Sequence, residues 1–122
     1  MFEVCVRQTF SAAHLLRGYA GKCARTHGHN YTVEVTLQSS KLNEIGLVVD
    51  FVEVKQRMKE VIERLDHFHL NDIPPFDTVN PSAENLALFF HDQLTGAWPE
   101  GVRLAMVRIF ETETARAAYR PE

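Results

Sequence analysis

The stretch HGHNYTVEVTL, His27 to Leu37, alternates apolar and polar side chains from Tyr31 onward. The apolar positions are Tyr31, Val33, Val35 and Leu37. Alternation with a period of two predicts a β-strand that buries one face. Because residues two apart share a face, His27 and His29 are expected to project on the same side as these apolar residues.

A second alternating stretch, FEVCVRQTFSAAH, lies upstream, from Phe2 to His14. Its apolar side continues through Phe10 and Ala12 to His14, so this strand is also predicted to end on a histidine on the apolar face. The thiol of Cys5, in the middle of the strand, is expected to be buried and apolar. Between the two strands, the glycine-containing segment LLRGYAGKCART is interpreted as a loop.

Two helices are predicted downstream of these strands. The first follows Asp50, which has the arrangement of a capping box with Glu53. Its apolar residues at helical spacing are Val54, Met58, Val61, Ile62 and Leu65. The second helix is expected to have Asn80 as its cap and Pro81 in its first position, and to run to about Leu94.

A last strand is predicted over residues 102–114, where VRLAMVRIFETET is apolar enough to be buried from both sides. The segment GLVVDF, residues 46–51, would add a short extended piece. The order of elements predicts an α+β fold with a four-stranded antiparallel sheet and two helices on one face. No repeat, linker or low-complexity tract interrupts residues 1–122, so one domain is expected.

The composition argues against several classes of partner. A net charge of −3 offers no broad basic surface, so the chain is not expected to bind nucleic acid. No apolar run is long enough to span a membrane, and the alternating first residues do not resemble a signal peptide. Two cysteines do not make a disulfide framework, so a cytoplasmic protein is expected.

The histidines suggest a metal site. His27 and His29, side by side, form half of a zinc site, and His14 at the end of the preceding strand is the plausible third ligand. Three imidazoles with one open position are typical of catalytic zinc, whereas Cys23 as a fourth ligand would give a closed structural site. The third alternative is that an isolated His-x-His pair is only a surface or core feature.

Two further positions carry acid–base chemistry. Asp66 directly precedes His67 where the first helix ends, and a carboxylate beside an imidazole suits proton transfer near neutral pH. The alternative is an ordinary helix terminus.

Glu111 interrupts an apolar strand, where a carboxylate is costly to bury unless it binds a ligand with paired hydrogen-bond donors. The alternative there is a strand that emerges into water.

Six segments together resemble the 6-pyruvoyltetrahydropterin synthase superfamily in their order and spacing. They are FSAAH, CARTHGHNY, GLVVDF, LDHFHLND, NPSAENLA and FETETA. The short gap between Cys23 and His27 resembles that of the bacterial 6-carboxytetrahydropterin synthases of queuosine biosynthesis, whereas the animal pyruvoyl enzymes usually have a longer gap. Cys23 is present and no acidic residue lies between it and His27, which disfavours the branch that replaces this cysteine with glutamate.

The resemblance implies a tunnelling fold (T-fold), whose subunits join sheet edge to sheet edge into a barrel, here as a hexamer. The site residues that it implies are His14, His27 and His29 for zinc, Cys23, Asp66 and His67 for catalysis, and Glu111, Thr112 and Ser82 for the substrate. Within this set, Cys23 would be a thiolate base and Glu111 would hold the pterin. Lys22 and Arg25 are candidate phosphate contacts, with a solvated loop as the alternative.

The reaction implied by the resemblance is a zinc-dependent conversion of 7,8-dihydroneopterin triphosphate to 6-carboxy-5,6,7,8-tetrahydropterin, with release of triphosphate and acetaldehyde. Zinc would act as a Lewis acid on the substrate side chain. Two alternatives stay open. One keeps the family and makes 6-pyruvoyltetrahydropterin the product, and the other is a non-catalytic, zinc-stabilised oligomeric binding module.

Overall fold

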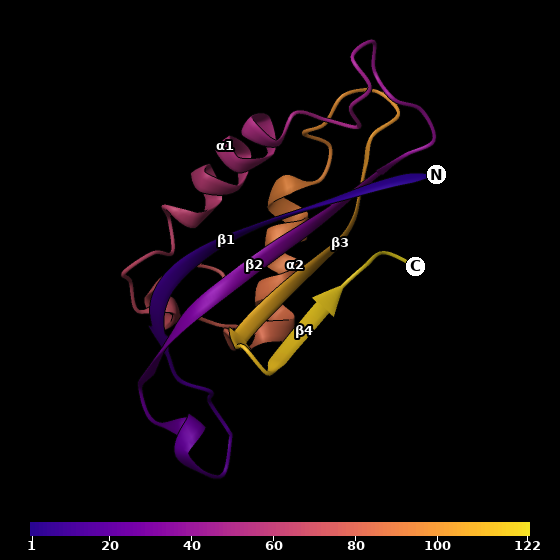
Figure 1. Ribbon diagram of the computed structural model, residues 1–122. Coiled ribbons are helices and arrows are strands. Elements are labelled where there is room, and N and C mark those ends of the chain that lie inside the picture. Colours follow the sequence, from indigo (N-terminus) through magenta and orange to yellow (C-terminus); the bar gives the residue numbers. More distant parts are fainter.

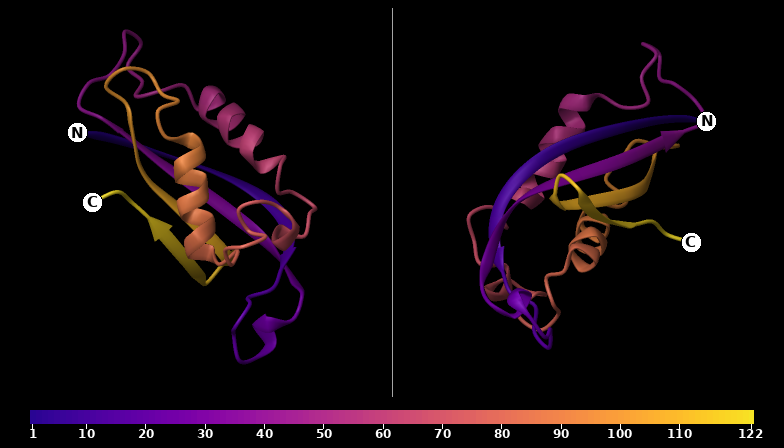
Figure 2. Two further views of the ribbon diagram at one scale, coloured as in Figure 1. Left: turned by 180° about the vertical axis from the view of Figure 1, so that it is seen from behind. Right: turned by 60° about the horizontal axis from the view of Figure 1, so that its bottom comes forward.

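Four strands form one antiparallel sheet in the order β1-β2-β3-β4. Their bounds are Phe2–His14 for β1, His27–Ser39 for β2, Arg103–Thr112 for β3 and Ala115–Tyr119 for β4. The computed structural model describes residues 1–122, and Figures 1 and 2 show helices α1 (Phe51–Ile62) and α2 (Ala83–Leu94) on the same face of the sheet. The predicted α+β fold with two helices on one face is therefore confirmed.

The long β1–β2 hairpin positions the histidines. The two strands pair over their full length, with Phe10 opposite Tyr31 and His14 opposite His27. The apolar positions of β2, from Tyr31 to Leu37, are completely buried under the helices. The predicted alternation is thus observed, and it carries His14 and His27 to the same end of the sheet on the helix-covered side.

The opposite face of the sheet carries polar side chains. Cys5 lies there and is exposed, with its Sγ 3.3 Å from Thr36 Oγ1, so the expected burial of this thiol is wrong. The reason is parity, because Cys5 alternates with Val4 and Val6 and so faces away from the helices.

An ion-pair cluster joins the three longer strands on this polar face. Glu34 on β2 accepts hydrogen bonds from Arg7 on β1, at 2.6 Å, and from Arg108 on β3. Burial opposes the ionisation of Glu34, but the hydrogen bonds and charges of the two arginines outweigh it and lower the pKa of the carboxyl group. The charged cluster therefore links β1, β2 and β3, which are distant from one another in the sequence.

The helix starts differ in part from the sequence-based expectation. Asp50 caps α1 as predicted, but its Oδ1 accepts from Val52 N at 2.9 Å, and Glu53 pairs with Arg57 instead of closing a capping box. Helix α2 begins at Ala83 with Ser82 as its cap, so the expected cap at Asn80 and first position at Pro81 are wrong. Neither helix is long and apolar enough to cross a membrane.

The C-terminal part of the chain forms two strands where the sequence predicts one. Residues 102–114 were expected to form one strand, but β3 ends at Thr112 and a tight turn leads into β4. The fourth strand is β4, and the segment at residues 46–51 contains bends instead of a strand. In β3, only Leu104, Val107 and Ile109 are buried, because the helices cover a single face of the sheet.

Two connections carry the remaining candidate site residues. The loop after β1, residues 15–26, contains the short 3₁₀ helix η1 (Lys22–Ala24) and projects beyond the end of the sheet (Figure 1). The connection from α1 to α2 contains the 3₁₀ helix η2 (Leu70–Asp72). It runs along the outer edge of β1, where His69 forms an isolated bridge with Ala13.

Candidate active site

Three histidines meet at the end of the β1–β2 hairpin. His14 comes from the end of β1, and His27 and His29 come from the start of β2. One ring nitrogen of each lies within 4.8 Å of the others, and His14 Nε2 is 3.0 Å from His27 Nε2. Cys23 is not a member of this mutually close group, which favours an open three-histidine site over a closed four-ligand one.

The hydrogen bonds around the rings show that a cation fits this cluster. His14 Nδ1 lies 2.7 Å from Pro81 O, and His27 Nδ1 lies 2.7 Å from Arg25 O. Carbonyl oxygens only accept, so each Nδ1 donates and each Nε2 of the neutral ring carries a lone pair. Two lone pairs then face each other, and His29 Nε2 is buried with no hydrogen-bond partner. A cation between the three rings would satisfy all of them.

The protonation state of the rings agrees with metal binding. Burial lowers the pKa of His14, which is only 1% exposed. Burial also lowers the pKa of His29, although the charge of Glu111 works in the opposite direction. Both imidazoles are therefore neutral near pH 7, which is the form that binds a metal ion.

A depression of about 310 Å³ brings together residues from four parts of the chain. Cys23 from η1, Ser82 from the start of α2 and Glu111 from β3 line it, together with the β4 residues 115–117. Glu111 Oε2 lies 4.0 Å from His29 Nε2, so the depression adjoins the histidine cluster. Three of the sequence-predicted residues therefore share one cavity beside the candidate metal site.

The hydroxyl groups of Ser82 and Thr112 have structural partners. Ser82 Oγ accepts from Asn85 N at 3.1 Å as the cap of α2, and Thr112 Oγ1 accepts from Thr114 N at 3.3 Å in the β3–β4 turn. Thr112 lies outside the depression of Cys23 and lines a neighbouring one, together with His29 and Glu111. Substrate contacts by these two hydroxyl groups remain a prediction.

Asp66 and His67 form a pair beside the outer edge of β1. Asp66 Oδ1 accepts from Ser11 N at 2.9 Å and lies 3.0 Å from His67 Nδ1. The Ser11 N–H lowers the pKa of Asp66, so this carboxylate stays ionised and can orient the imidazole. His67 has a φ of 64°, an uncommon conformation for a residue with a side chain, and such outliers cluster at functional sites.

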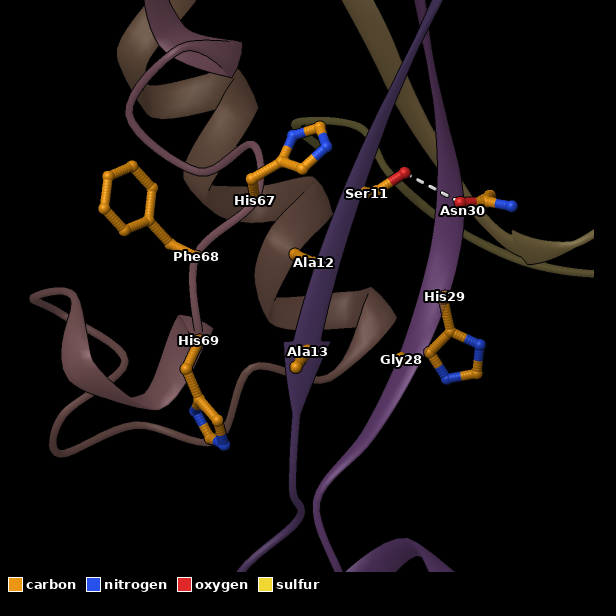
Figure 3. Close-up of a pocket in the computed structure, with 9 residues that line it drawn as sticks. All are labelled: Ser11, Ala12, Ala13, Gly28, His29, Asn30, His67, Phe68 and His69. Carbon is orange, nitrogen blue, oxygen red and sulfur yellow. Dashed lines mark hydrogen bonds between the residues drawn. The ribbon is translucent and has the colours of Figure 1, made fainter.

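A single chain does not bring His67 to Cys23. Figure 3 shows His67 on the side of β1 away from β2, where its backbone N–H donates to Ser11 O. It lines a depression with Phe68 and His69, whereas Cys23 lines the one described above. The imidazole of His67 is highly exposed and has no partner other than Asp66. The predicted catalytic residues are therefore divided between two sides of one subunit.

Two residues that sequence reasoning left without a role also lie at these depressions. Tyr19 lines the depression of Cys23, and its position in a glycine-containing loop was the only signal in the sequence. His69 Nε2 lies 3.2 Å from Thr26 Oγ1, which links the connection between the helices to the loop that carries Cys23. No pattern in the sequence indicates this long-range contact.

Comparison with known proteins identifies the family. The profile of the 6-pyruvoyl tetrahydropterin synthase family matches residues 3–122. The chain belongs to this family. The solved structure of the 6-pyruvoyl tetrahydropterin synthase of Caenorhabditis elegans is similar to this one. The TM-score is 0.88 and the sequences are 29% identical, over 99% of this chain and 96% of that chain. The family fold expected from the sequence is thereby confirmed.

Relatives within the 6-pyruvoyl tetrahydropterin synthase family have two different names. The chain is 35% identical to the 6-pyruvoyl tetrahydrobiopterin synthase of Dictyostelium discoideum, over 95% of this chain and 93% of the relative. It is 34% identical to the 6-carboxy-5,6,7,8-tetrahydropterin synthase of Synechocystis sp., over 91% of this chain and 87% of the relative. The two identities are nearly equal, and both relatives show that the chain is a pterin synthase of this family.

Proposed function

We propose that the protein converts 7,8-dihydroneopterin triphosphate and one water molecule to 6-carboxy-5,6,7,8-tetrahydropterin, triphosphate and acetaldehyde. The observation that carries this proposal is the depression that joins Cys23 and Glu111 beside the three-histidine cluster. This depression places a thiol that can act as a base, a carboxylate and a candidate metal site within reach of one small molecule. The short gap between Cys23 and His27 supports the carboxy product over the pyruvoyl product.

Glu111 is the residue that would orient the pterin. A carboxylate has two acceptor oxygens and can bind the paired N–H donors of an amino-pyrimidine edge. Glu111 Oε2 lies 4.0 Å from His29 Nε2, so a pterin bound by this carboxylate would lie beside the histidine cluster. Binding the ring at a fixed distance from the metal site supplies the orientation that the chemical steps need.

Cys23 and His67 would move the protons. A zinc ion held by His14, His27 and His29 would supply Lewis acidity that makes the C–H bonds of the substrate side chain more acidic. Cys23 would remove a proton from that side chain as a thiolate base. His67, oriented by Asp66 at 3.0 Å, would donate and accept protons on the opposite side of the substrate.

The direct test is to incubate the purified protein with 7,8-dihydroneopterin triphosphate and to identify the products by mass. We expect 6-carboxy-5,6,7,8-tetrahydropterin and acetaldehyde. A 6-pyruvoyl product without acetaldehyde would support the alternative reaction of the same family. Pterin binding with no turnover, in protein that contains zinc, would support the non-catalytic binding module.

Replacing Glu111 by glutamine should weaken pterin binding strongly. The amide turns one of two acceptor oxygens into a donor, and a hydrogen bond with a charged partner contributes about 1.5–3 kcal/mol. We expect KM to rise about 10- to 100-fold, with unchanged zinc content. The matched control is Glu44→Gln, an exposed carboxylate in the loop between β2 and α1, which should keep the KM of the natural protein. An unchanged KM in Glu111→Gln would remove this residue from the pterin site.

The edges of the β-sheet suggest how Cys23 and His67, which lie apart in one subunit, could form one active site. The outer strands β1 and β4 lie at the two edges of the sheet. Residues 66–69 cover the end of β1 near Ser11 and Ala13, but no strand pairs with the earlier residues of β1 or with the outer side of β4. Open edges in natural proteins are usually paired or covered. The Asp66–His67 pair lies beside the edge of β1, and the Cys23 depression is lined by residues of β4. Joining β1 of one copy to β4 of the next would place His67 of one subunit near Cys23 of its neighbour. We therefore propose a homo-oligomeric barrel, with a hexamer as the expected size.

Mixing two inactive variants tests this shared site. Cys23→Ala and His67→Ala should each be inactive alone, but subunits exchanged between them should regain turnover. In a ring with random equimolar mixing, about a quarter of the sites would combine an intact Cys23 with an intact His67. We expect activity near that fraction after joint refolding. No recovery in a mixed oligomer, confirmed by differently tagged subunits, would place both residues in the same subunit's site.

A further inference from the structure

We propose that Asn71 and Asn80 are positioning residues that hold the Cys23 loop in place for catalysis. The inference rests on the proposed function, because Cys23 is its proton-abstracting group. It starts from the correction at the start of α2, where Asn80 does not cap the helix. The side chain of Asn80 is instead used on a backbone segment far away in the sequence.

Each asparagine binds both polar groups of one backbone residue. Asn71 Oδ1 accepts from Leu15 N at 3.0 Å, and Asn71 Nδ2 donates to Leu15 O at 3.1 Å. Asn80 repeats the pattern two residues later, accepting from Arg17 N at 2.9 Å and donating to Arg17 O at 2.9 Å. Four hydrogen bonds therefore hold Leu15 and Arg17, the first and third residues after β1, and we call each of these asparagines a clamp.

These two amides take the place of a neighbouring strand. In a β-ladder, alternate residues exchange an N–H and a C=O with their partner, and residues 15 and 17 do the same with the two side chains. Only an amide side chain offers a donor and an acceptor together in this geometry. A carboxylate would lose the donor, and an alanine would lose both bonds.

Leu16 lies between the two residues held by the clamps and contacts the backbone of Cys23. Leu16 N donates to Cys23 O at 2.7 Å. The clamps on Leu15 and Arg17 fix where Leu16 lies, and Leu16 in turn fixes the backbone of Cys23. The loop of residues 15–26 projects beyond the sheet (Figure 2). Its other side-chain hydrogen bonds to the rest of the chain lie near its two ends, from Arg17 to Phe76 O and between Thr26 and His69, and from the His27 ring to Arg25 O.

The Asn80 clamp is itself tied to the metal site and to α2. Asn85 Nδ2, in the first turn of α2, donates to Asn80 O at 2.9 Å. The next residue, Pro81, provides the carbonyl that accepts from His14 Nδ1 at 2.7 Å. One short segment therefore sets both a candidate zinc ligand and the loop of the thiol. This connection explains how their relative positions can be maintained.

The test compares Asn71→Ala and Asn80→Ala with Asn43→Ala. Asn43 is the matched control because its Oδ1 also holds a loop, accepting from Ile45 N and Leu47 N, but lies outside the site. We expect each clamp variant to lose about 10²-fold in kcat, the size expected for a misplacement of about 1 Å, with a smaller change in KM and normal zinc content. Asn43→Ala should keep the kcat of the natural protein.

A second measurement does not depend on turnover. Alkylation of each cysteine by iodoacetamide, followed by mass mapping, compares half-buried Cys23 with exposed Cys5 in the same molecule. In the clamp variants Cys23 should react several-fold faster and Cys5 at an unchanged rate. If the natural protein shows no turnover, the proposed function fails, while this readout still reports on the clamp.

Three results would overturn the proposal. They are an unchanged kcat and Cys23 alkylation rate in both clamp variants, a loss of kcat that follows loss of zinc, and an equal loss in Asn43→Ala. If an alanine variant does not fold, Asn80→Asp replaces it. Aspartate fills the same space and keeps the bond from Arg17 N, but it removes the donation to Arg17 O. It should also lower kcat and expose Cys23.

Discussion

Replacing Cys23 by alanine is expected to abolish turnover while the protein keeps its zinc, its fold and its affinity for substrate. General-base catalysis contributes about 10²–10⁴-fold, so kcat should fall by at least that factor. The variant removes only the thiol. The contact that fixes the loop, from Leu16 N to Cys23 O, involves the backbone and remains.

This substitution separates a base from a metal ligand. Cys23 lies outside the group of three mutually close histidine nitrogen atoms, so its loss should not change zinc content. A structural fourth ligand predicts the opposite, since zinc would then bind more weakly and the free energy of unfolding would decrease. Measuring zinc by elemental analysis beside kcat distinguishes the two roles in one experiment.

Cys5→Ala is the matched control for the thiol. Cys5 is exposed on the polar face of the sheet, away from the helices and the histidine cluster. Its replacement should leave kcat, zinc content and thermal stability unchanged. If Cys23→Ala turned over at the same rate as Cys5→Ala, with normal zinc content, Cys23 would have no part in the chemistry.

The histidine cluster could be predicted because it depends on local periodicity. The alternation that buries Tyr31 also places His27 and His29 on the same face, and the hairpin register puts His14 opposite His27. Strand parity is a short-range property, so a sequence contains it completely. The same rule, applied to Cys5, would have predicted its exposure.

The remaining features depend on contacts between distant parts of the chain. Asn80 and Ser82 have similar capping chemistry, and only the partner of Asn80, Arg17, decides which of them caps α2. The fourth strand, with the sequence ARAAY, has too little apolar alternation to be recognised. The separation of His67 from Cys23 could not be predicted either, because it depends on where two loops lie relative to the sheet.

Replacing His27 by alanine is expected to remove the zinc. It is the best of the three histidines to change, because it lies near the surface, whereas His14 is only 1% exposed and its loss would leave a cavity. Two imidazoles remain in the variant, and a stable zinc site ordinarily has at least three protein ligands. We expect zinc to fall from about one per chain to well below that, and turnover to be lost with it.

The matched control is His67→Ala, which removes an imidazole from outside the cluster. Both variants should be inactive, but His67→Ala should retain its zinc, so metal loss and activity loss are separated. A chelator should lower the melting temperature of the natural protein and of His67→Ala, because a metal that binds only the folded state stabilises it. It should leave the melting temperature of His27→Ala unchanged. One zinc per chain in purified His27→Ala would show that the metal is bound elsewhere.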